Sequence, residues 1–136
     1  MKDELNLPKR DNFCFVCGEE NPKGMHLKFN RYSNRVESTF SLDKIYQGYD
    51  NIIHGGIISL ILDEAMAYLQ SKEERFLTGR ITVRFHNPLL AGEEVKVKAW
   101  IKKDRKRIKE TCAVMEKLDG TKIAEAEAIM FVRKEK

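Results

Sequence analysis

Two adjacent carboxylates, Asp63 and Glu64, interrupt an otherwise apolar stretch of the sequence between Ile57 and Leu69. The apolar residues of this stretch fall on every side of a helical wheel, which predicts a helix buried on most faces. An unpaired carboxylate is costly to bury, so such groups are usually paired, raised in pKa or functional. The alternative is that both residues reach solvent along a narrow polar strip, because neighbours lie about 100° apart on the wheel.

A second feature with chemical potential is His54-Gly55-Gly56, which leads directly into this helix. Glycines lack a Cβ, so a ligand can approach the backbone closely. The first N–H groups of a helix have no partner within it, and the helix dipole is positive there. Such a place can bind an anion or a carbonyl oxygen that gains negative charge. On the glycines alone, an ordinary tight turn is the simpler explanation.

The distance between the two features predicts an oligomer. Gly55 and Asp63 are eight residues apart, which is about 12 Å along a helix axis. One carbonyl group cannot touch both residues of the same chain. Two antiparallel helices that meet across a two-fold axis would bring the start of each helix to the middle of the other. If both features belong to one site, the protein is at least a dimer with composite sites.

The elements that must position these residues are predicted to be strands around one helix. The helix is expected from about Gly55 to Ser71, and residues 26–42 read as two strands around a turn. Beyond the helix the chain alternates between apolar and polar residues, with a strong turn signal at Asp119-Gly120. One helix beside five or six antiparallel strands predicts an α+β fold.

Length and composition predict one globular domain, with 136 residues, 42% hydrophobic and 34% charged. Residues 1–12 are expected to be a flexible N-terminus, and residues 13–136 the single domain. The net charge of +4 is too small to indicate nucleic-acid binding. No apolar run reaches the ~20 residues of a membrane span, and no signal peptide is visible. Together with an odd number of cysteines, this predicts a cytoplasmic protein without a membrane partner.

The stretch from Tyr46 to Ala65 closely resembles the hotdog-fold thioesterases of the PaaI type, whose signature is His-Gly-Gly with an acidic residue nine positions after the His. Asp63 fits that spacing. The segments 13–27 and 83–89 also resemble members of this family, so the likeness covers roughly residues 13–133. It implies an antiparallel sheet wrapped around one long central helix. It also implies homodimers, or dimers of dimers, that hydrolyse acyl-CoA thioesters without a metal or cofactor.

Carried over by position, Asp63 becomes the catalytic carboxylate, and the Gly55 N–H of the partner subunit becomes the oxyanion donor. His54 falls on the motif histidine, which often orients the loop rather than acting as a base. Thr78 falls where relatives carry a serine or threonine, and its hydroxyl would position water or Asp63. Asp63 would act as a general base or attack the thioester directly, and the sequence is compatible with both routes.

The resemblance also implies substrate contacts. Many relatives have an asparagine six residues before the histidine to help hold the carbonyl group, but this position is Gly48. Gln47 or Asn51 could supply that donor instead. Gly56 and Glu64 complete the expected substrate-binding residues. Two other functions stay open: a non-catalytic acyl-CoA binding or sensing protein on the same fold, and a hotdog hydratase or dehydratase.

Three further groups have ordinary explanations. Cys14-x-x-Cys17 lacks the second cysteine pair of a closed zinc site, although His26 is a candidate third ligand. No metal is therefore expected, and the cysteine pair is interpreted as part of a packed loop. Tyr68, with its neighbours Met66 and Leu69, could shape an acyl pocket, but plain core is the simpler interpretation. A basic cluster is interpreted as a solvated hairpin tip, with a dock for the CoA phosphates as the alternative; it comprises Lys102, Lys103, Arg105, Lys106, Arg107 and Lys109.

Overall fold

The computed structural model describes residues 11–134, so most of the predicted flexible N-terminus lies outside the described residues. The elements are β1 (Asn30–Arg31), β2 (Val36–Ser41), the 3-10 helix η1 (Lys44–Tyr46), α2 (Gly55–Ala67), β3 (Glu74–Phe85), β4 (Glu94–Arg105), β5 (Ile108–Lys117) and β6 (Lys122–Lys134). Among the described residues, no helix has the length and apolar character needed to cross a membrane.

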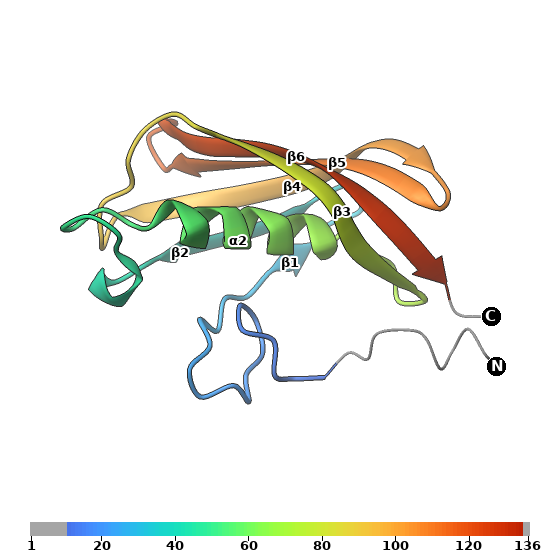
Figure 1. The fold of residues 1–136 in the computed structure, drawn as a ribbon, viewed down its shortest axis with the longest axis horizontal. Coiled ribbons are helices and arrows are strands. Elements are labelled where there is room, and N and C mark those ends of the chain that lie inside the picture. The colour runs from blue at the N-terminus through green and yellow to red at the C-terminus, as the bar shows by residue number, and fades with distance from the viewer. Residues whose placement is uncertain (1–10, 135–136) are drawn as a thin grey trace.

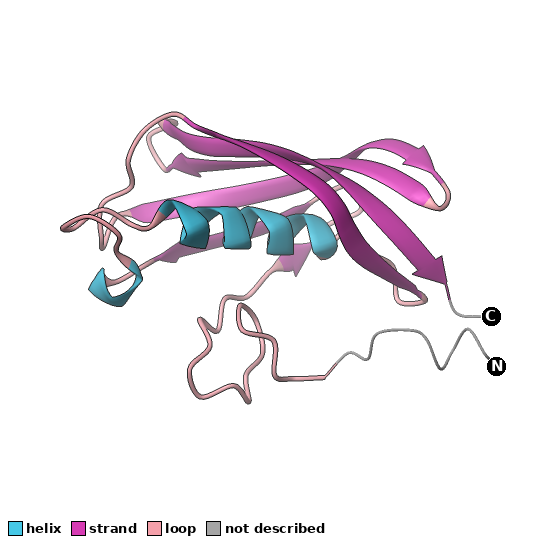
Figure 2. Cartoon of the chain, viewed as in Figure 1, coloured by secondary structure: helices cyan, strands magenta, loops and turns pink. Residues whose placement is uncertain are grey.

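The strands form one antiparallel sheet in the order β1-β2-β4-β5-β6-β3. Figure 1 shows the sheet curving around α2, which lies along one of its faces, and Figure 2 shows the single long helix against the strands. Among the described residues, the strand that follows the helix, β3, pairs only with β6 and therefore forms an edge of the sheet. The predicted α+β architecture, a six-stranded antiparallel sheet around one helix, is confirmed.

Small side chains on the inner face of the sheet allow the helix to lie close to it. Ala99 on β4, Ala113 on β5 and Ala126 on β6 are all buried, and the helix fills the space with Ile61 and Leu62, which are fully buried. Packing of this apolar helix face removes large side chains from water and stabilises the fold. The backbone that carries Asp63 and Glu64 is thereby held in a fixed position.

The helix is shorter than predicted, because it ends at Ala67 instead of Ser71. Two hydrogen bonds to side chains hold the chain in place after Ala67. The Gln70 side-chain oxygen accepts a hydrogen bond from the Phe76 N–H at 2.7 Å, and the Ser71 N–H donates to Glu74 Oε1 at 3.2 Å. These contacts direct the chain into β3. The strand begins several residues before the stretch in which apolar and polar residues alternate in the sequence.

The loop that contains the two cysteines is held by backbone hydrogen bonds. Its two halves are joined by backbone hydrogen bonds from Met25 N–H to the Phe15 carbonyl (2.8 Å) and from Leu27 N–H to the Val16 carbonyl (2.9 Å). Val16 is buried and belongs to the hydrophobic core. This attachment brings Cys14 and Cys17 against the helix, at Glu64.

Candidate active site

Asp63 contacts Thr78, a residue of the edge strand β3. The Thr78 hydroxyl donates a hydrogen bond of 2.6 Å to Asp63 Oδ1 and also lies 3.5 Å from Met130 Sδ. A hydrogen bond to a carboxylate stabilises its charged form and fixes its orientation. Asp63 is half-buried, and its second oxygen makes no hydrogen bond among the described residues. The structure therefore brings together two of the residues that the sequence singled out.

A β-bulge turns Thr78 towards the helix. Thr78 pairs with Met130, whereas Arg80 pairs with Ile129, so Gly79 is an extra residue on β3. If the strand alternated regularly through Gly79, Thr78 would lie on the same face as Arg80, away from α2. A Cβ on Gly79 would lie 2.1 Å from a ring carbon of Phe131, which explains the glycine. The bulge is the local feature that makes the contact between Thr78 and Asp63 feasible.

The helix start presents a backbone donor. His54 precedes the first helical residue, and its Nδ1 accepts a hydrogen bond of 2.8 Å from the Gly56 N–H. The His54 side chain therefore acts as a cap that orients the loop. Within residues 11–134, the Gly55 N–H has no hydrogen-bond acceptor. An N–H group at the positive end of a helix is suited to an oxyanion.

Gly55 and Asp63 lie beside different parts of β3. Gly55 is next to Phe85, since a Cβ added to Gly55 would lie 3.5 Å from the Phe85 ring. Asp63 is next to Thr78, seven residues earlier on the strand. The separation of Gly55 and Asp63 along the helix is about 12 Å. One chain therefore does not bring both groups to a single carbonyl.

The loop before the helix uses its polar groups to hold its own shape. Gln47 Oε1 accepts a hydrogen bond of 2.9 Å from the Asn51 N–H, and Asn51 has a positive φ of 61°. The Gly48 N–H donates to the Ile52 carbonyl at 2.8 Å, and a Cβ on Gly48 would lie 3.3 Å from the His54 ring. The side-chain amide groups of Gln47 and Asn51 make no hydrogen bond as donors among the described residues.

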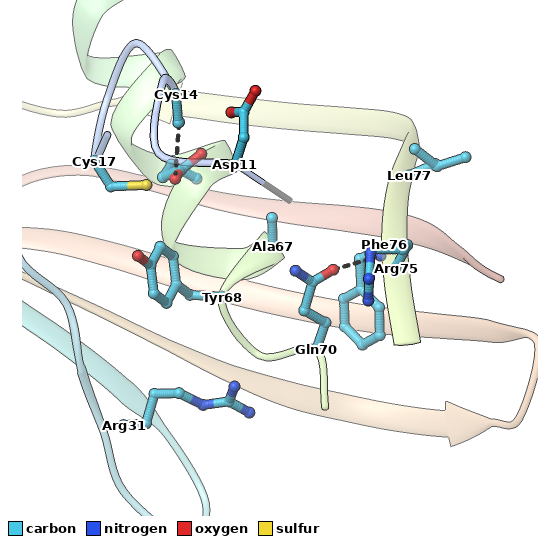
Figure 3. Close-up of a pocket in the computed structure, with 11 residues that line it drawn as sticks. Asp11, Cys14, Cys17, Arg31, Ala67, Tyr68, Gln70, Arg75, Phe76 and Leu77 are labelled. Carbon is cyan, nitrogen blue, oxygen red and sulfur yellow. Dashed lines mark hydrogen bonds between the residues drawn. The ribbon is translucent and has the colours of Figure 1, made fainter. Parts of the chain in front are cut away.

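Glu64 faces a different environment from Asp63. Its Oε2 accepts a hydrogen bond of 3.4 Å from the Cys14 thiol, and both residues line a pocket of about 450 Å³. Figure 3 shows this pocket at the C-terminal part of the helix, with Cys14, Cys17 and Tyr68 among the residues that line it. Tyr68 is a pocket candidate from the sequence, whereas Phe76 also lines this pocket and was not predicted. No local pattern marks Phe76, because β3 reaches the pocket only through the turn after the helix.

The cysteine loop holds the Cys17 thiol in its neutral form near this carboxylate. Burial raises the pKa of Cys17 to about 12, and the nearby Glu64 contributes to the rise. Burial also raises the pKa of Tyr68, with a smaller effect from Cys17. His26, the candidate third ligand from the sequence, is instead hydrogen bonded through Nε2 to the Asn21 carbonyl at 2.7 Å. The third potential metal ligand near the two cysteines is the carboxylate of Glu64.

Much of the basic cluster is neutralised by acidic neighbours. Lys109 is buried and lies 3.4 Å from Glu74, while Lys102 lies 3.7 Å from Glu127. A third member, Arg105, lies 3.9 Å from Glu110. Only two residues, 106 and 107, form the tip of the β4–β5 hairpin, so most of the cluster lies on the strands themselves. These ion pairs favour a structural explanation over a phosphate dock.

Residues 50–124 match the family model of the thioesterase superfamily. A search of curated proteins finds no match. Several solved structures are similar to the chain. A crystal structure of a thioesterase superfamily protein has a TM-score of 0.79 and 23% identity, and it aligns with 87% of this chain. The chain spans 62% of that protein's length.

Two bacterial structures are similar over most of their own length. A Streptococcus mutans protein, solved bound to acetyl CoA, has a TM-score of 0.74 and 18% identity over 81% of this chain and 91% of its own. The PaaI protein from the phenylacetic acid degradation operon of E. coli has a TM-score of 0.72 and 15% identity, over 81% of this chain and 80% of its own. At these identities the likeness concerns the fold.

Proposed function

Because the chain belongs to the thioesterase superfamily, we propose that it hydrolyses acyl-CoA thioesters to a free acid and coenzyme A. Its predicted resemblance to this superfamily and its predicted hotdog fold are confirmed. The acyl-CoA substrate is supported by the S. mutans structure, which is bound to acetyl CoA. The observation that carries the proposal is the contact between Asp63 and Thr78 at an accessible edge of the sheet.

Asp63 supplies the base in the proposed reaction. The Thr78 hydroxyl holds Asp63 Oδ1, which leaves the second oxygen to accept a proton from water. The resulting hydroxide attacks the thioester carbon, and the carbonyl oxygen becomes negative. When the carbon–sulfur bond breaks, the proton on Asp63 passes to the leaving thiolate. In the alternative route, Asp63 attacks the carbon itself and water hydrolyses the mixed anhydride.

The oxyanion rests on the Gly55 N–H of a second subunit. This N–H has no acceptor among the described residues of its own chain, and it lies too far from Asp63 to share a carbonyl with it. Such donors are most effective when they are fixed before the reaction. His54 fixes this one, because its capping of the Gly56 N–H orients the turn. The same cap explains why Gly56 is the weaker candidate donor.

The edge strand β3 supplies the surface for this dimer. It exposes Leu77 (42%), Ile81 (36%) and Phe85 (55%), an apolar edge that favours pairing with another strand. Antiparallel pairing with β3 of a second copy, centred on Thr82, places Thr78 opposite Phe85 of the other subunit once the extra residue Gly79 is counted. Because Phe85 lies beside Gly55 and Thr78 beside Asp63, this register brings each helix start to the other chain's carboxylate.

The remaining substrate contacts are assigned to the loop before the helix and to the pocket beside it. The free amide groups of Gln47 and Asn51 are the candidates for a second carbonyl donor, in place of the missing asparagine at Gly48. Glu64 lines the pocket next to Asp63, where it would contact the acyl group. Charged and polar pocket residues such as Glu64 favour a short or polar acyl group over a long alkyl chain.

The activity is tested with a panel of acyl-CoAs assayed for thiol release. Turnover of at least one short or polar acyl-CoA by the purified chain is expected. Binding of acyl-CoA without thiol release would favour the sensing alternative, and loss of substrate without free thiol would favour a hydratase. Single-turnover hydrolysis in ¹⁸O-water separates the two routes, because only direct attack leaves label in Asp63 for a later cycle.

A further inference from the structure

Three metal-binding side chains from two distant segments meet beside the helix. The Sγ atoms of Cys14 and Cys17 and a carboxylate oxygen of Glu64 all lie within 4.8 Å of one another. Figure 3 shows the two cysteines on the N-terminal loop, with a dashed line from Cys14 to this carboxylate. The hydrolysis described above uses neither thiol. The cluster therefore calls for an explanation of its own.

The donor set has the chemistry and the spacing of a zinc site. Thiolate and carboxylate ligands bind zinc at about 2.3 and 2.0–2.2 Å, which places them about 3.5 Å apart in a tetrahedral site. The distance from Cys14 Sγ to Glu64 Oε2 is 3.4 Å. Thiolates select zinc over calcium and magnesium, which prefer oxygen ligands. We propose that Cys14, Cys17 and Glu64 bind a zinc ion, with the fourth coordination position facing the pocket.

The chain builds this site before any metal arrives. Gly18 donates its N–H to the Cys14 carbonyl at 2.8 Å, which closes the turn between the two cysteines. A Cβ on Gly18 would lie 2.3 Å from the Cys14 nitrogen, so this tight turn requires glycine. Val16, between the cysteines, is buried in the core and anchors the loop. Both thiols are thereby directed to one side, where the helix presents Glu64.

The fourth position is open because only three ligands meet here among the described residues. Zinc sites with three protein ligands keep a position for water or another ligand. This position faces the pocket of about 450 Å³, which Tyr68 and Phe76 also line. The ion would clamp the N-terminal loop onto the helix, one residue from Asp63. It takes no part in the hydrolysis, so the site stands whether or not the proposed activity is found.

Metal binding is tested on the full chain, purified under reducing conditions and freed of metal with a chelator. After zinc is added back and the unbound metal is removed, the expected result is one zinc ion per chain by elemental analysis, together with a higher melting temperature than that of the metal-free chain. Replacement by cobalt gives thiolate-to-metal charge-transfer absorption, which reports sulfur ligands directly. Cys14→Ser and Cys17→Ser are each expected to reduce this absorption, because one of the two thiolate ligands is removed. Each should also weaken zinc binding by more than about tenfold, since loss of even an outer group costs 10- to 100-fold.

Cys112→Ser is the matched control. Cys112 lies on β5 between the buried Thr111 and Ala113, so it faces the other side of the sheet from the helix. This variant should keep full metal binding. Glu64→Gln should weaken binding while keeping the thiolate absorption, which assigns the third ligand.

Melting temperatures measured in chelator show whether each variant folds. Absence of stoichiometric zinc in the reduced, folded chain would overturn the proposal. Equal weakening by Cys112→Ser, or cobalt binding without thiolate absorption, would overturn it as well. A disulfide between Cys14 and Cys17 that persists under the reducing conditions would also contradict it.

Discussion

Asp63 and Glu64 are the same kind of group, one peptide bond apart, yet they face two different regions of the molecule. Asp63 meets the Thr78 hydroxyl on β3, the strand whose outer edge is open to a second chain. Glu64 meets the Cys14 thiol in a loop that closes one side of a pocket. The two side chains therefore differ in environment because of their positions around the helix, and not because of their residue type. The Asp63 region is proposed to react, and the Glu64 region to bind.

The largest expected effect comes from Asp63→Asn, which keeps the shape of the side chain but removes the base. Loss of a general base typically lowers the rate by about 10²- to 10⁴-fold. We expect a fall of kcat in this range with unchanged folding and oligomeric state, measured by thiol release and size-exclusion chromatography. Near-normal turnover by this variant would remove Asp63 from the reaction.

Gly55→Pro removes the proposed oxyanion donor with little effect on the helix. Proline is favoured at the first helical position, and His54 already has a backbone conformation that suits the residue before proline (φ −59°, ψ 133°). We expect kcat to fall by about 10²- to 10³-fold. Gly55→Ala is the matched control, because it keeps the N–H and a Cβ there meets only the Phe85 ring at 3.5 Å. Equal losses in the two variants would point to crowding instead of a missing donor.

Thr78→Val tests whether the hydroxyl orients Asp63. Hydrogen bonds to charged groups contribute about 1.5–3 kcal/mol, so a loss of about 10- to 100-fold in kcat is expected. Thr78→Ser keeps the hydroxyl and should restore most of the rate, whereas a purely structural role would leave both variants similarly affected. The kcat values of the two variants, compared at equal melting temperature, decide between these outcomes.

The smallest expected effect on the chemical step comes from Glu64→Gln. Because Glu64 is directed at the cysteine loop, we expect kcat to change by less than about tenfold and the larger part of the effect to fall on KM. A fall in kcat as large as that of Asp63→Asn would erase the distinction between the two regions. Steady-state kinetics with one acyl-CoA substrate measures both parameters.

The sequence predicted the helix start and the five or six strands, because these features depend on local pattern and spacing. The choice of Asp63 over Glu64 rested on the family resemblance, and its role stays a prediction. It placed the helix end wrongly, since Gln70 and Ser71 are drawn away by partners in β3 that carry no helix-stop signal. The orientation of Thr78 could not be read from alternation, because the bulge at Gly79 depends on Phe131, about fifty residues away in the chain.

The sequence offered only His26 as a candidate third partner of the cysteines, for the same reason. His26 is close to Cys14 and Cys17 in sequence, but its ring is occupied by the Asn21 carbonyl. Glu64 is fifty residues from Cys14 and reaches it only through the packing of the loop on the helix. Contacts between segments that are distant in the sequence determine the surroundings of Asp63 and of Glu64. No local sequence pattern predicts these contacts.

Mixing Asp63→Asn with Gly55→Pro tests the composite site most directly. Each variant alone is expected to be nearly inactive. When the two are unfolded together and refolded, half of the dimers are hybrids, and each hybrid contains one site in which both groups are intact. The account predicts recovery of about one quarter of the wild-type activity, because one of every four sites is then complete. No recovery above the separate variants, with hybrid dimers present, would show that Asp63 and Gly55 of different subunits do not share a site.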